Sequence, residues 1–169
     1  NVEEAVSIGI KIQNTLKELI MKELGEESVV LGNEGGFAPK ISDIRKPLEF
    51  LSKAIKENNL EGKIRLSLDV AASSFFENNF YKIAGQDISK EELMGIYDSL
   101  IKEFDLFSIE DAFDEEDFES FAKLKRENNN LFVVGDDLIV TNILLLKKAI
   151  EKKSINERKV DMYSNPGVM

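Results

Sequence analysis

Apolar side chains recur at helical spacing in the first sixty residues of the chain. They occupy every third or fourth position over residues 3–24, which predicts an amphipathic helix there. A second helix is predicted over residues 46–58, with Pro47 in its first turn, where a missing N–H is tolerated. Residues 29–39 between these helices are rich in glycine and predict an irregular loop.

The remainder of the chain alternates short apolar runs with helix-length amphipathic segments. The runs predict strands over residues 64–70, 80–83, 106–110 and 131–135. The longer segments predict helices over residues 89–104, 117–128 and 142–152. Ser89 and Glu92 have the spacing of a capping box at the start of the first of these helices. Because the connections between the main strands are too long for hairpins, the pattern predicts an α/β fold with parallel strands and right-handed crossovers.

Each of the main predicted strands in this region ends in a carboxylate, namely Asp69, Glu110 and Asp136. Parallel strands place their carboxyl ends at one edge of the sheet, where three such groups would repel one another unless a cation lay between them. The alternative is that each carboxylate caps the helix that follows it. The coincidence of three carboxylates at one edge favours a shared metal site.

The composition narrows the chemistry that such a site can perform. The 169 residues fit one domain, and 43% of them are apolar, which is enough for a packed core. The sequence has no cysteine and no histidine, which excludes disulfides, thiolate metal sites and the commonest general base. The remaining donors are mainly carboxylates, which suit a hard cation such as Mg²⁺ better than zinc or copper.

The charge of the chain limits its partners. A formal net charge of −10 disfavours binding to nucleic acid or to an anionic membrane. The sequence has no apolar run of membrane-spanning length, and its first residues do not resemble a signal peptide. We therefore expect a cytoplasmic protein that binds neither membranes nor nucleic acids.

Glu34 is a second candidate for chemistry, because it lies in the glycine-rich loop immediately before Gly35 and Gly36. Glycines permit unusual backbone angles and close approach to a ligand, so Glu34 could act as an acid or base beside a metal-bound substrate. The alternative is a tight turn with an exposed glutamate. The loop is not a phosphate loop, because no Gly-Lys-Ser/Thr follows the glycines.

Four segments together resemble the signature motifs of the enolase family, in that family's order and spacing. They are Gly32–Pro39, Leu68–Ser73, Ser108–Phe113 and Gly135–Asn142. The resemblance extends over residues 3–153 and implies a partial (β/α) barrel of enolase type, which this chain alone cannot close. It divides the chain into a partial catalytic barrel domain over residues 1–153 and a divergent tail over residues 154–169.

The resemblance also implies an activity. Enolase, or phosphopyruvate hydratase, is a glycolytic lyase that interconverts 2-phosphoglycerate and phosphoenolpyruvate with Mg²⁺, so the implied substrate is a small phosphorylated carboxylic acid. By resemblance, Asp69, Glu110 and Asp136 bind the metal, and Glu34 belongs to the acid that helps to expel the 3-hydroxyl group.

Departures from the family pattern limit what we expect of this chain alone. Asn33 stands where the family has aspartate, and Ala112 and Ile143 stand where it has proline. The family's proton-abstracting lysine lies on the next barrel strand, whereas Ser154–Lys159 contains no apolar run that ends in lysine, and Lys159 is a poor substitute. We therefore expect a central segment of the barrel that lacks turnover by itself.

Two alternative functions remain open at this level. One is a non-catalytic, Mg²⁺-binding remnant that assembles with itself or with the rest of an enolase chain through its open sheet edges. The other is a different enzyme of the enolase superfamily.

Overall fold

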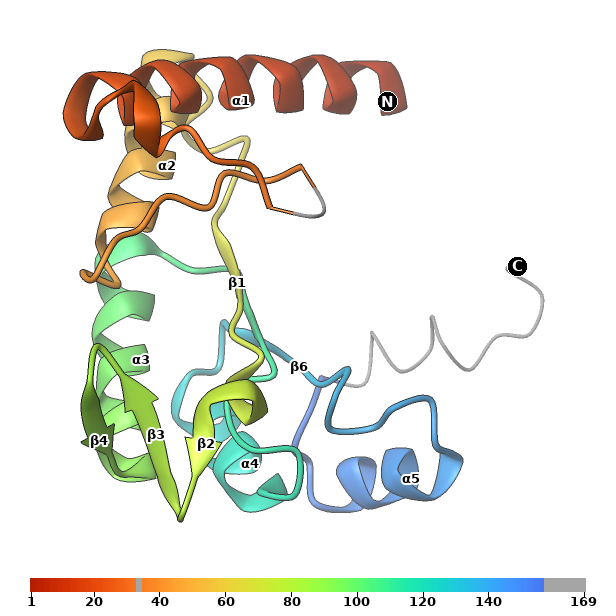
Figure 1. The fold of residues 1–169 in the computed structure, drawn as a ribbon. Helices are drawn as coiled ribbons and strands as arrows, with labels where there is room; N and C mark the ends of the chain where they lie inside the picture. Colours follow the sequence, from red (N-terminus) through yellow and green to blue (C-terminus); the bar gives the residue numbers. More distant parts are fainter. Residues whose placement is uncertain (33–34, 157–169) are drawn as a thin grey trace. The chain divides into compact units, whose positions relative to one another are not determined.

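The computed structural model describes residues 1–32 and 35–156, which are arranged in two compact units (Figure 1). The first unit comprises residues 1–66, and the second begins at Ser67. Glu34, Lys159 and most of the predicted tail over residues 154–169 lie outside the described residues.

The first unit is built on the packing of α1 (Val2–Leu24) against α2 (Lys46–Glu57). Leu19 and Ile20 of α1 form its core together with Phe50 and Ala54 of α2. Leu19, Ile20 and Ala54 lie on the apolar faces that the sequence pattern predicts, whereas Phe50 was not predicted there; both predicted helices are confirmed.

The segment between these helices is irregular, as predicted. It contains the short 3₁₀ helix η1 (Glu26–Ser28) and one antiparallel bridge between Leu31 and Phe37. The backbone N–H of Ala38 donates to the carbonyl of Val30 at 2.8 Å, which brings the two ends of the loop together.

The second unit contains a parallel sheet in the order β1-β5-β6. Its strands are β1 (Ser67–Asp69), β5 (Ser108–Glu110) and β6 (Phe132–Val134). The predicted parallel pairing is confirmed, although each strand is shorter than its apolar run. Ile109 and Val133, in the middle of β5 and β6, are fully buried and turn one face of the sheet toward the core.

Each of these strands is followed by a helix further along the chain. The helices are α3 (Lys90–Phe104), α4 (Phe118–Glu127) and α5 (Ile143–Glu151). The predicted capping box is confirmed: the Ser89 hydroxyl accepts from the Glu92 N–H, and the Glu92 carboxylate accepts from the Ser89 N–H. Phe113 lies between α3 and α4, with its ring packed edge-to-face on Tyr97 and Phe121.

An antiparallel sheet follows β1 and the 3₁₀ helix η2 (Ala72–Phe75). Its strands are β2 (Phe76–Glu77), β3 (Phe80–Ile83) and β4 (Gln86–Ile88). The sequence pattern predicts only β3, because the other two strands are short and largely polar. Asn78 and Asn79 both have positive φ angles of 53° and 68°, which suits the tight turn between β2 and β3.

Among the described residues the parallel sheet is open, and the predicted α/β class with parallel strands is confirmed. None of the helices in residues 1–32 and 35–156 is long and apolar enough to cross a membrane.

Candidate functional site

Asp69 and Glu110 lie directly opposite each other at the carboxyl ends of β1 and β5. Neighbouring strands are about 4.8 Å apart, and residues paired in a parallel register share one face of the sheet. The backbone N–H of Val70 donates to the carbonyl of Glu110 at 3.0 Å, so the register continues past both carboxylates. The prediction that these two acids share an edge is therefore correct.

Asp136 lies beyond the end of the next strand. Glu110 pairs with Val134, the last residue of β6, and Asp136 follows two positions later. The Asp136 carbonyl accepts hydrogen bonds from the N–H groups of Ile139 and Val140, at 3.2 and 2.8 Å, and so begins a turn. Asp136 thus belongs to the same end of the sheet, although it lies outside the strand ladder.

These carboxylates do not form a closed ligand set. In the described part of the chain, no three acidic side chains stand close enough together to hold a metal ion. Asp69 and Asp136 are exposed and Glu110 is half-buried. The structure therefore shows that the three carboxylates lie at one edge of the parallel sheet, in the order Asp69, Glu110, Asp136.

The alternative of helix capping is wrong for all three carboxylates. The side-chain caps of α3, α4 and α5 are Ser89, Asp117 and Asn142. Each of these residues lies several positions after the strand-terminal acid that precedes it. None of the three strand-terminal acids therefore caps these helices.

Asp111 directly follows Glu110 and is not one of the predicted metal ligands. Its side chain is only 4% exposed, and its carboxylate accepts from the backbone N–H groups of Asp136 and Asp137 at 3.0 and 3.1 Å. Burial raises the pKa of Asp111 to about 6; the nearby charge of Asp137 acts in the same direction, and the backbone hydrogen bonds act against both. The only available signal was an acid that directly follows another acid at a strand end.

The loop after Asp111 is held by tyrosines from two elements. The Tyr97 hydroxyl of α3 donates to the carbonyl of Ala112 at 2.7 Å, and the Tyr81 hydroxyl of β3 accepts from the N–H of Asp114 at 2.9 Å. Burial raises the pKa of Tyr81 to about 12 and that of Tyr97 well above its usual value. Both hydroxyls therefore stay protonated and act as fixed hydrogen-bonding groups.

Gly135 is required by close packing at the end of β6. A Cβ atom at this position would lie 2.8 Å from the Cβ of Leu138 and 3.3 Å from a methyl group of Ile155. Any side chain would therefore push apart the turn that begins at Asp136.

A cleft of about 400 Å³ adjoins this turn on the side of α5. Asp137 and Glu116 line it together with Lys148, whose ammonium group lies 3.9 Å from the centre of the Phe118 ring.

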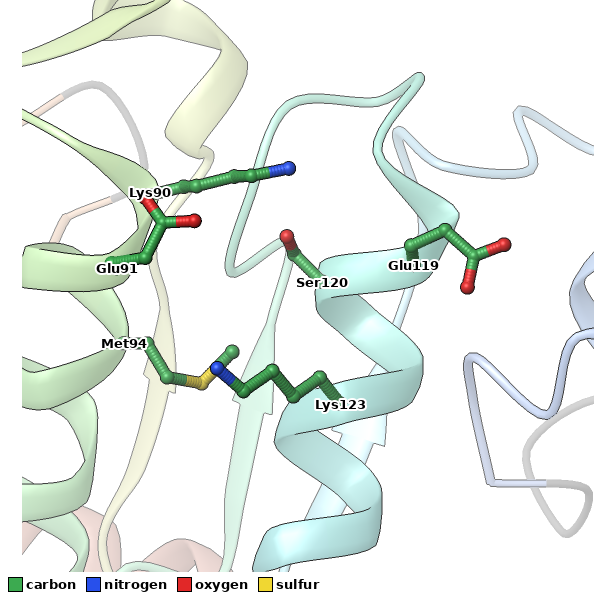
Figure 2. A pocket seen from close by; sticks show the side chains of 6 residues that line it. All are labelled: Lys90, Glu91, Met94, Glu119, Ser120 and Lys123. Atoms are coloured by element: carbon green, nitrogen blue, oxygen red, sulfur yellow. The ribbon is translucent and has the colours of Figure 1, made fainter.

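A second pocket, of about 180 Å³, lies between the first two turns of α3 and those of α4 (Figure 2). Lys90, Glu91 and Met94 line it from α3, and Glu119, Ser120 and Lys123 line it from α4. Lys90 pairs with Asp117, and Glu119 pairs with Lys152, so these charges are matched within the helix layer. This pocket supplies no group to the edge that carries Asp69 and Glu110.

The fold and the site together define an α/β protein with acidic residues at the carboxyl ends of parallel strands, where proteins of this class bind ligands. The chain belongs to the family described as "Enolase, C-terminal TIM barrel domain", whose model matches residues 1–163.

Curated relatives agree with this assignment. The chain is 40% identical over 156 residues to the enolase of Methanocaldococcus jannaschii, with 92% of this chain and 37% of that protein covered. It is 42% identical over 153 residues to the enolase of Methanococcus aeolicus, with 89% and 36% covered. It is 39% identical over 166 residues to the enolase of Solanum lycopersicum, with 92% and 37% covered. The chain thus spans somewhat more than a third of the length of these relatives.

Proposed function

We propose that this chain is the metal-binding part of an enolase catalytic barrel domain, in an enzyme that interconverts 2-phosphoglycerate and phosphoenolpyruvate. The observation that carries the proposal is the parallel pairing of Asp69 with Glu110 in a chain of the enolase family. Its barrel part comprises residues 1–153, followed by a divergent tail over residues 154–169.

Asp69, Glu110 and Asp136 are the proposed ligands of Mg²⁺. The fit rests on donor chemistry, because carboxylate oxygens are hard ligands and the sequence has neither histidine nor cysteine to favour a softer metal. Asp69 and Asp136 are exposed, so their side chains are able to turn toward a cation. A bound Mg²⁺ would stabilise the second negative charge that develops on a substrate carboxylate when its α-proton is removed.

Glu34 is proposed to be part of the general acid that assists departure of the 3-hydroxyl group of the substrate. An acid at this position would deliver a proton to the leaving oxygen and so avoid the expulsion of hydroxide. Support for this role comes from the motif Gly32–Pro39 in the sequence.

By itself, the 169-residue chain is proposed to bind Mg²⁺ without turning over substrate. The family's proton-abstracting lysine belongs to the strand after α5, and Ser154–Lys159 does not have the pattern of such a strand. The outer edge of β1 would then pair with a second copy or with the remainder of an enolase chain in the cytoplasm.

Magnesium titration by calorimetry tests the proposed ligands. Asp69→Ala and Glu110→Ala should each weaken Mg²⁺ binding at least about 10-fold, because each removes a charged ligand. Glu127→Gln is the matched control, since Glu127 ends α4 and therefore lies away from the carboxyl ends of the strands. Equal affinity in the wild type and both alanine variants would remove the metal assignment.

A coupled assay with 2-phosphoglycerate tests the proposal about turnover. The isolated chain should give no rate above that of the Asp69→Ala variant. A rate comparable to that of a full-length enolase would overturn this part of the proposal.

A further inference from the structure

Asp111 links the segments that follow β5 and β6. Its backbone N–H donates to the carbonyl of Val134 at 3.1 Å, which is the last ladder bond between these strands. Its side chain then continues the connection, because one carboxylate oxygen accepts from the N–H of Asp136 and the other from the N–H of Asp137. Asp111 therefore makes hydrogen bonds to three residues along the end of β6 and the turn beyond it.

The backbone of Asp111 makes this arrangement possible. Its φ angle is 46°, in the left-handed region that aspartate tolerates better than most residues. The strand geometry of β5 therefore ends at Glu110, and the next side chain can reach the turn after β6. Glu110 is the last residue of β5, whereas the carboxylate of its neighbour Asp111 is buried and accepts from backbone N–H groups.

Burying the carboxylate of Asp111 is unfavourable for stability, which suggests that its two hydrogen bonds serve a specific purpose. Desolvating the charge is unfavourable, and backbone N–H groups compensate it only while both hydrogen bonds are kept. One carboxylate oxygen of Asp111 accepts from the N–H of Asp136, the third proposed metal ligand, and the other from the N–H of the next residue, Asp137. An apolar side chain would fill the same space without fixing these N–H groups.

We propose that Asp111 is a positioning residue that fixes the backbone of Asp136 relative to Glu110, and so sets the spacing of the metal ligands. The proposal deepens the proposed function and rests on it. We do not propose Asp111 as a metal ligand, because both of its carboxylate oxygens accept hydrogen bonds from backbone N–H groups.

Asp111→Asn tests the proposal, because the variant keeps the size of the side chain and replaces one acceptor by a donor. The amide ¹H and ¹⁵N resonances of Asp136 and Asp137 should shift, since one of the two hydrogen bonds is lost. Mg²⁺ affinity should fall about 10- to 100-fold, as is typical when a group that orients a metal ligand is removed.

Tyr97→Phe is the matched control, which tests whether losing any buried hydrogen bond in this loop weakens Mg²⁺ binding. It removes a buried hydrogen bond to Ala112, in the same loop, without touching Asp136. Both variants are titrated with MgCl₂ at a temperature where they remain folded. Equal Mg²⁺ affinity in Asp111→Asn and Tyr97→Phe would overturn the positioning role.

The two proposals fail in different ways. If the wild type does not bind Mg²⁺, the metal assignment and the positioning role both fail, although the amide shifts still report whether the hydrogen bonds exist. If the wild type binds Mg²⁺ and Asp111→Asn binds equally well, only the positioning role fails.

A measurement on the wild type covers the case in which Asp111→Asn does not fold. During a titration with MgCl₂, the Asp136 and Asp137 amides and the Asp111 carboxyl carbon should shift together with one dissociation constant. A shift of the Asp69 and Glu110 resonances that leaves these three unchanged would contradict the proposal.

Discussion

The hydroxyl of Tyr97 donates a 2.7 Å hydrogen bond to the backbone carbonyl of Ala112, fifteen residues along the chain and two residues after Glu110. Both residues are buried, so no solvent can replace this bond. The bond ties α3 to the loop that follows the central strand of the parallel sheet. The geometry of that loop thus depends on a residue of the preceding helix.

Tyr97→Phe should therefore lower the free energy of unfolding by about 1–3 kcal/mol, because it leaves the buried carbonyl of Ala112 without a donor. Tyr81→Phe is the matched comparison, since its partner is the N–H of Asp114, a residue that is partly exposed and can be hydrated. Urea unfolding followed by circular dichroism measures both variants. A loss for Tyr97→Phe no greater than that for Tyr81→Phe would contradict the assignment of a buried, unreplaced bond.

Gly135→Ala should destabilise the protein by about 1–3 kcal/mol, the usual cost of forcing an extra group into close packing. The new Cβ would lie 2.8 Å from the Cβ of Leu138. Gly95→Ala is the control, because Gly95 lies inside α3 with no atom within 4 Å of its added Cβ. That variant should gain roughly 0.5–1 kcal/mol from helix propensity. Thermal unfolding should therefore move in opposite directions for the two variants, and a common direction would contradict the packing argument.

The pH dependence of stability should contain a contribution from Asp117, the N-cap of α4. Burial by itself raises the pKa of this carboxyl, but hydrogen bonds from Ser120 and the charge of Lys90 outweigh burial and lower the pKa below 3.8. A carboxyl with a lowered folded-state pKa adds stability above its unfolded pKa, and this stability is lost as the pH falls through the folded pKa.

Asp117→Asn removes that titration while it keeps an oxygen that can accept from Ser120. The difference in unfolding free energy between the wild type and this variant should be largest near pH 6 and should shrink as the pH falls below about 4. Urea titrations at pH 6 and pH 3 measure it. A difference that is constant, or that grows toward acid, would rule out the lowered pKa.

Asn156 should stabilise the outer edge of β6. Its backbone N–H donates to the carbonyl of Val133 at 3.0 Å, and its side-chain oxygen accepts from the Val133 N–H at 2.8 Å. Asn156→Ala should cost about 1–3 kcal/mol, because the N–H of the fully buried Val133 loses its acceptor. Asn156→Asp keeps that acceptor and should cost less. Hydrogen exchange at the Val133 amide should speed up in the alanine variant alone.

Helices were predictable here because their signals are local and redundant. The capping box of Ser89 and Glu92 fixes the start of α3 within the residues that form it, and the apolar stripe of α1 repeats over many turns. The parallel strands were predicted at the right places, but each predicted strand was longer than the observed one. Their apolar runs continue past the hydrogen-bonded ladder, and the length of the ladder depends on the neighbouring strand.

The candidate site was predictable in part. The pairing of Asp69 with Glu110 follows from parallel register alone, once both strands are recognised. The contacts of Asp111 were not predictable, because they depend on a left-handed backbone angle and on N–H groups 25 and 26 residues away. No periodic pattern in a sequence reports such a contact.

The contact between Asn156 and Val133 has a consequence for how the second unit can form. The sheet order β1-β5-β6 follows the chain order, and residue 156 comes next on the outer edge of β6. Each new segment therefore docks beside the one synthesised before it, and no parallel pair has to wait for a partner made much later. Assembly of the sheet can thus proceed in step with emergence of the chain from the ribosome.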